Sequence, residues 1–152
     1  MSQKPQETKE KTLEEALKLL DGIREETGQV FELTTEEDML VREFLASLLK
    51  IIQPLAQEVP VSTLVLPEEL GIVSKASLDT TGQLLLLYPD ERMKLIDLSE
   101  RKHRDLLLKI TYDIMPTLGR LVTSHRQRIE ERVSFMSYVT KELQKTAKAF
   151  SP

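Results

Sequence analysis

The strongest pattern in the chain is the spacing of apolar residues in its C-terminal third, from Ser99 to about Phe150. Apolar side chains recur there at steps of three, four or their sums, which is the period of a helix. They are Leu107, Ile110, Ile114, Leu118, Leu121, Val122, Ile129, Val133, Met136, Val139, Leu143, Ala147 and Phe150. The spacing predicts a long amphipathic helix over about residues 99–150, with Ser99 as its N-cap.

The length of this predicted helix is a physical problem for the chain. About 50 residues make roughly 75 Å of helix, whereas a compact domain of 152 residues has a diameter of roughly 40 Å. The apolar stripe therefore needs cover, from a fold-back of the helix or from a second chain. Pro116 and Gly119 mark the place where the helix could break. The apolar phase passes through Pro116 without a slip, which favours a kink in one helix over a hairpin.

Two capping boxes predict two helices near the N-terminus. Thr12 and Glu15 would open the first, which Gly28 would end, and Thr34 and Glu37 would open the second, which runs to about residue 53 or 57. The polar stretch 1–11 is predicted to be a disordered tail. Residues 12–152 would then form a single domain.

Residues 72–98 have the pattern of a small antiparallel β-meander. Two tight turns, Asp79–Gly82 and Tyr88–Glu91, separate three short runs of strand-forming residues. The middle run, 83–88, is apolar without alternation, which predicts a strand covered on both faces. Residues 59–66 contain Pro60 and would be an edge strand or an extended connection. The predicted fold class is α+β, with two N-terminal helices, the meander, and a long kinked C-terminal helix at about 99–150.

Composition and charge narrow the function classes. The chain has no cysteine, which excludes disulfides, a thiol nucleophile and thiolate metal sites, and fits a reducing cytoplasm. The longest aliphatic run has four residues, Leu84–Leu87, too few to span a membrane. Residues 1–98 carry 10 basic against 19 acidic side chains, and residues 99–152 carry 11 against 6. This split predicts attraction between an acidic body and a basic helix, within or between subunits, or an acidic partner for the helix.

No group of residues has the spacing of a catalytic, cofactor or metal site. Glu100 and His103 are three residues apart, as in di-iron bundles, but the motif occurs once and is expected to be a surface pair. His125 falls on the apolar stripe, where we expect a packing residue rather than a ligand or pH switch. Asp113, beside Tyr112, is expected to form a cap or a salt bridge near Pro116. The sequence thus gives no positive indication of an enzyme or of a cofactor.

Four arginines near the middle of the long helix, Arg120, Arg126, Arg128 and Arg132, are the candidate nucleic-acid contacts. Nucleic-acid surfaces usually combine such a basic band with aromatic side chains. The segment 120–132 contains no aromatic residue and includes Glu130 and Glu131. A solvated helix face or salt bridges between subunits explain the arginines better.

The favoured hypothesis is a non-enzymatic cytoplasmic interaction or assembly protein that binds a protein partner. It would form a dimer or larger oligomer, of coiled-coil type, through the long helix. The expected interface residues are Leu121, Val122, His125, Ile129, Val133, Met136, Val139 and Leu143. The alternative is a dimeric, winged-helix-like transcription regulator that binds nucleic acid. Its recognition helix would be 34–53, whose many acidic residues DNA would repel.

Overall fold

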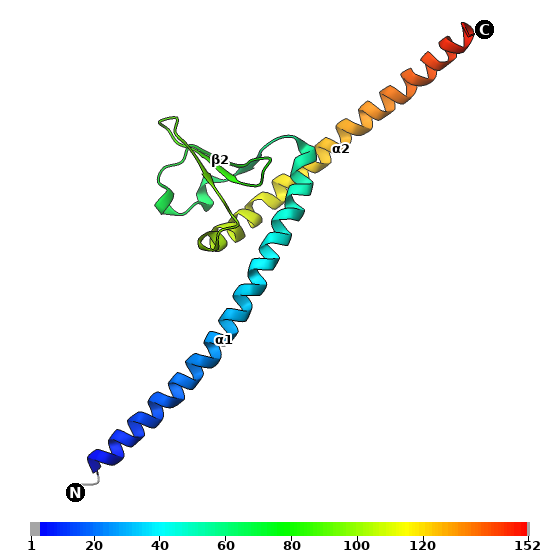
Figure 1. Cartoon of the computed structure of the whole chain (residues 1–152). Coiled ribbons are helices and arrows are strands. Elements are labelled where there is room, and N and C mark those ends of the chain that lie inside the picture. Colours follow the sequence, from blue (N-terminus) through cyan, green and yellow to red (C-terminus); the bar gives the residue numbers. More distant parts are fainter. Residues whose placement is uncertain (1–3, 152) are drawn as a thin grey trace. The chain divides into compact units, whose positions relative to one another are not determined.

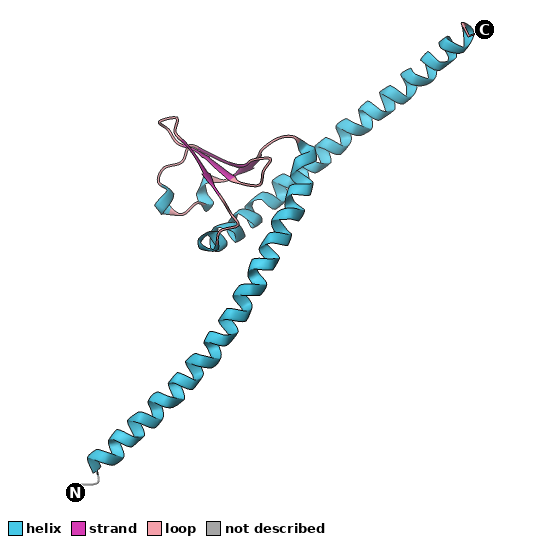
Figure 2. Cartoon of the chain, viewed as in Figure 1, coloured by secondary structure: helices cyan, strands magenta, loops and turns pink. Residues whose placement is uncertain are grey.

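The structure, a computed structural model, describes residues 4–151 and confirms the α+β class. It consists of helix α1 (Lys4–Ile52), a four-stranded sheet and helix α2 (Arg104–Ala149), with short 3-10 turns between them (Figures 1 and 2). Its contacts divide the chain into two units, one up to Phe44 and one from Leu45 onward. In the described residues, the first unit is α1 alone. The second unit holds the last turns of α1, the sheet and α2.

The prediction of two N-terminal helices is wrong, because α1 is one continuous helix. The hydroxyls that were expected to cap helices instead donate to the carbonyl one turn earlier: Thr12 Oγ1 to Thr8 O at 2.8 Å and Thr34 Oγ1 to Val30 O at 2.7 Å. Threonine has this second option inside a helix. Gly28 does not end the helix either. Of the predicted disordered tail, residues 4–11 are in α1, and residues 1–3 lie outside the described part.

The sheet is an antiparallel meander with the order β1-β2-β3-β4. Its strands are β1 (Val59–Val61), β2 (Lys75–Leu78), β3 (Leu84–Leu87) and β4 (Met93–Ile96). Both predicted turns are confirmed: Gly82 N donates to Asp79 O at 3.0 Å, and Glu91 N donates to Tyr88 O at 3.0 Å. The short β1, which contains Pro60, is the predicted edge strand.

One face of the sheet forms the core of the second unit. The register places Val59, Leu78, Leu84 and Ile96 in one row across the strands, and all four are buried. Helix α2 contacts β1 and contributes its own buried residues to the same core. These are Leu106, Leu107, Ile110, Ile114 and Leu118, and the last turns of α1 add Leu48 and Ile52. The core therefore uses only the N-terminal third of α2.

The opposite face of the sheet is partly open, so the prediction that β3 is covered on both faces is wrong. Leu84 and Leu86 are fully buried, but Leu85 is half-buried and Leu87 is exposed. Leu95 and Met93 lie opposite these two residues on β4 and are 55% and 68% exposed. The four-leucine run thus carries an uncovered apolar face.

Helix α2 begins later than predicted and is not interrupted at Pro116. Ser99 does not cap it: its N–H and hydroxyl bond to Asp97 Oδ1, at 2.9 and 2.6 Å, and a 3-10 turn, Arg101–His103, precedes the helix. The predicted kink, and the alternative hairpin, are not found; α2 is one unbroken helix. Pro116 has no N–H group to donate to the carbonyl of Tyr112, one turn earlier. Both residues are exposed, so this carbonyl can bond to water instead.

Candidate functional site

The apolar stripe of α2 continues far beyond the core. The last buried residue of α2 is Leu118, and every later residue is half-buried or exposed. Figure 1 shows this part of α2, in orange and red, extending away from the sheet of the same unit. Val122, Ile129, Met136 and Leu143 follow one another at intervals of seven residues, and we call these four the α2 seam. A seven-residue repeat of apolar side chains is the signature of helix-to-helix packing in a coiled coil.

Exposure rises along the α2 seam. Val122 and Ile129 are 41% and 40% exposed, whereas Met136 and Leu143 are 58% and 63% exposed. The first two line an open hollow of about 410 Å³ together with Ile51, on the last turn of α1. The last turn of α1 therefore covers the start of the seam in part, and the described chain leaves the rest uncovered.

The other predicted interface residues flank the α2 seam. Leu121, His125 and Val139 are half-buried, and Val133 is 61% exposed. His125 lies between Val122 and Ile129 in the same hollow, so it is brought to the stripe as the spacing predicted. The partly exposed apolar stripe of α2 is therefore wider than the four seam residues alone.

The four arginines proposed for nucleic acid do not form a free basic band. Arg126 pairs with Glu130, one turn later, at 2.9 Å, and Arg120 Nη2 lies 3.4 Å from Thr117 Oγ1. Arg128 and Arg132 line an open hollow of about 440 Å³ that also contains Glu131. Carboxylates are thus interleaved with the positive charges along this part of α2.

Asp113 has a structural partner that the sequence did not reveal. Its Oδ2 accepts a hydrogen bond from the backbone N–H of Ser62 at 2.8 Å, in a partly buried position. The Ser62 hydroxyl in turn accepts from the backbone N–H of Leu64 at 3.3 Å. Asp113 therefore fastens the segment after β1 to α2, which is a structural role but is neither the helix cap nor the salt bridge that was expected.

Glu100 and His103 do not come together as a metal site would require. The carboxylate of Glu100 pairs with Lys102 at 3.3 Å, and His103 contacts Glu100 through a backbone hydrogen bond of 3.0 Å. Nearby, the two hydrogen bonds from Ser99 hold the pKa of Asp97 below its ordinary value of 3.8, and the charge of His103 acts in the same direction. Within residues 4–151, no three His, Cys, Asp or Glu side chains form a group that could hold a metal ion.

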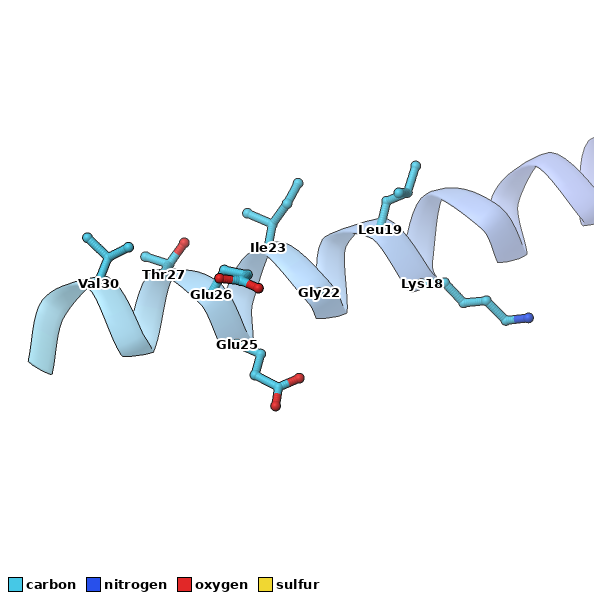
Figure 3. A pocket seen from close by; sticks show the side chains of 8 residues that line it. All are labelled: Lys18, Leu19, Gly22, Ile23, Glu25, Glu26, Thr27 and Val30. Carbon is cyan, nitrogen blue, oxygen red and sulfur yellow. The ribbon is translucent and has the colours of Figure 1, made fainter. Parts of the chain in front are cut away.

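A second uncovered apolar surface, which the sequence did not single out as an interface, lies on α1. Figure 3 shows part of it: Leu19, Ile23, Thr27 and Val30 point to the same side of the helix. The signal in the sequence was the seven-residue repeat that runs through both capping boxes, at residues 13, 20, 27, 34 and 41.

Comparison of the chain with protein-family models, with curated proteins and with solved structures found no match. No helix in the described part of the chain combines the length and apolarity needed to cross a membrane.

Proposed function

We propose that this chain is a non-enzymatic cytoplasmic assembly protein that self-associates through the C-terminal part of α2 and binds a protein partner. The observation that carries the proposal is the α2 seam, a heptad repeat of apolar residues that the described chain leaves 40–63% exposed. Contiguous exposed apolar surface of this kind marks interaction sites in soluble proteins. The absence of cysteine fits a reducing compartment.

The energy available from the α2 seam can be compared with the cost of association. Fully burying an aliphatic side chain or a methionine contributes about 1.5–3 kcal/mol. Because roughly half of each seam side chain is still exposed, the four seam residues of two copies would contribute on the order of 6–12 kcal/mol. Association costs about 4–15 kcal/mol in lost freedom. The gain is thus comparable to the cost, and stable association would need additional buried surface beside the seam.

The nucleic-acid alternative has less support. A winged-helix arrangement needs a turn before the recognition helix, at about residues 28–34, whereas α1 is continuous there. Its basic contacts would be Arg120, Arg126, Arg128 and Arg132, among which Glu130 and Glu131 are interleaved. Carboxylates in that position oppose binding to a phosphate backbone.

The test of the proposal is the substitution Met136→Glu. It introduces a charge into the centre of the α2 seam, where burial would leave it without a partner, so association should weaken strongly. The matched control is Ser134→Glu, because Ser134 is exposed on the opposite side of α2 and gains the same charge. Sedimentation equilibrium should show an oligomer for the unsubstituted chain and for Ser134→Glu, and a shift toward monomer for Met136→Glu. A concentration-independent monomer of 17.4 kDa for the unsubstituted chain would contradict the proposal.

A further inference from the structure

The feature that the proposed function leaves unexplained is the apolar face of α1. Ten large apolar side chains between residues 13 and 40 are each more than half exposed. They are Leu13, Leu17, Leu19, Leu20, Ile23, Val30, Phe31, Leu33, Met39 and Leu40. In the described residues, the first unit contains no element besides α1. Most helices in proteins owe their stability to packing of an apolar face against another element, so an uncovered face of this kind indicates a missing partner.

The seven-residue period of the α2 seam is also found on this face, with threonine at two of its five positions. Leu13, Leu20, Thr27, Thr34 and Val41 are spaced by seven residues, and we call these five the α1 seam. The hydroxyl of Thr34 is bonded to its own helix at Val30 O, so this threonine needs no outside hydrogen-bond partner. Two seams with the same seven-residue period can pack knobs into holes along their length.

Charge indicates which kind of helix the α1 seam accepts. Residues 13–44 carry 10 acidic and 3 basic side chains, so a second copy of the same segment, or an anionic lipid surface, would be repelled. Residues 119–149 of α2 carry 7 basic and 3 acidic side chains. The segment with the opposite charge and the matching period is therefore present in the chain itself, and it is the segment whose own apolar stripe lacks cover.

We infer that the α1 seam of one copy packs against the α2 seam of a second copy. This inference rests on the proposed function, since it identifies the surface that the α2 seam binds during self-association. Opposite charge favours this pairing over α1 with α1 or α2 with α2, because like charges facing each other disfavour the wrong partner. Each chain carries one seam of each kind, so the contacts can close reciprocally in a dimer or continue from copy to copy.

The experiment that separates this inference from the proposed function uses one substitution in each seam of the full-length chain. Leu20→Glu disrupts the α1 seam, and Met136→Glu disrupts the α2 seam. Gln29→Glu is the control for α1, because Gln29 is exposed on the opposite side of the helix and the charge change is the same. Leu20→Glu should weaken self-association at least tenfold, as Met136→Glu does, while Gln29→Glu leaves it unchanged. Circular dichroism of the variants checks that the second unit keeps its fold.

Mixing the two variants gives a second, stricter result. The chain with Leu20→Glu keeps an intact α2 seam, and the chain with Met136→Glu keeps an intact α1 seam, so an equimolar mixture should associate although neither variant does so alone. If Met136→Glu abolishes association and Leu20→Glu does not, α2 binds another α2; the inference then fails and the proposed function stands. If neither substitution has an effect, both fail.

A chemical measurement on the unsubstituted protein identifies the contact directly. Equal amounts of ¹⁴N- and ¹⁵N-labelled chains are mixed and treated with a carbodiimide, which joins carboxylates to lysines in contact. The expected products are mixed-isotope peptide pairs that link acidic residues of 13–44 to Lys141, Lys145 or Lys148. Mixed pairs confined to residues 119–149, or pairs from one isotope only, would overturn the inference.

Discussion

The division of α2 into a core segment and an uncovered segment can be tested with the same substitution at two places. Ile110 is 1% exposed and lies in the core, whereas Ile129 is 40% exposed and lies in the α2 seam. Replacing a buried isoleucine by alanine removes its transfer free energy and leaves a cavity, at a cost of about 2–5 kcal/mol. We expect Ile110→Ala to lower the free energy of unfolding by an amount in that range.

The expectation for Ile129→Ala depends on protein concentration. In the separated chain the loss should be about 1 kcal/mol or less, because much of the side chain is already in water. In the oligomer the same side chain is buried, so the loss should be larger. Self-association adds stability by mass action, and a hundredfold rise in concentration corresponds to about 2.7 kcal/mol at most for a simple two-state linkage.

The assay is urea denaturation at two protein concentrations a hundredfold apart, followed by circular dichroism. The unsubstituted chain and Ile110→Ala should both shift their midpoints upward with concentration, by similar amounts. Ile129→Ala should shift much less, because its association is weakened. If Ile129→Ala costs as much as Ile110→Ala at both concentrations, Ile129 is covered by its own chain, and the interpretation of the α2 seam as an interface is wrong.

Two further predictions concern the polar contacts of the second unit. Asp113→Ala should lower the free energy of unfolding by about 1.5–3 kcal/mol, because it leaves the partly buried N–H of Ser62 without its charged acceptor. In urea denaturation, Asp113→Asn should lower this free energy by less. Equal losses for the two variants would show that the charge contributes nothing. The folded-state pKa of Asp97 is depressed, so its hydrogen bonds with Ser99 should stabilise the fold above about pH 4 and lose this effect as the pH falls through the lowered pKa. In an NMR titration, Ser99→Ala should move the pKa of Asp97 upward toward 3.8, and an unchanged value would assign the shift to another group.

The sheet could be predicted from the sequence because its signals are local. A turn such as Asp79–Gly82 is specified by the residues within it: Asp79 Oδ1 accepts from the N–H groups of Thr81 and Gln83, both at 2.9 Å. The meander order then follows from two short connections. The boundaries of the helices were less predictable. The residues that cap a helix are also tolerated inside one. For α1, the seven-residue repeat that continues past Thr12 and Thr34 was a stronger signal for one continuous helix than these two threonines were for helix starts.

Cover of apolar faces could not be predicted, because the pattern records only that a side chain is apolar. The run Leu84–Leu87 was interpreted as a strand covered on both faces, yet Leu87 and its neighbour Met93 are exposed. The α2 seam was predicted as a stripe that the chain cannot cover, and its exposure agrees with this. In both cases the pattern does not say which element covers the apolar face. The sequence contains that information only where the covering element belongs to a copy of the same chain.

The position of β4 at the edge of the sheet raises the question of how the chain avoids aggregation through this edge. An edge strand presents unpaired backbone groups that can template pairing with other chains, and the exposed Met93 and Leu95 add to that risk. Lys94 lies between these two residues in the sequence and is paired with the buried Leu86. It is therefore on the core face of the sheet, opposite the face that carries Met93 and Leu95, and yet it remains exposed. A strand from another molecule that continued the sheet would have to desolvate this ammonium group. One lysine therefore makes uncontrolled strand addition costly, and ordered association is left to the helices.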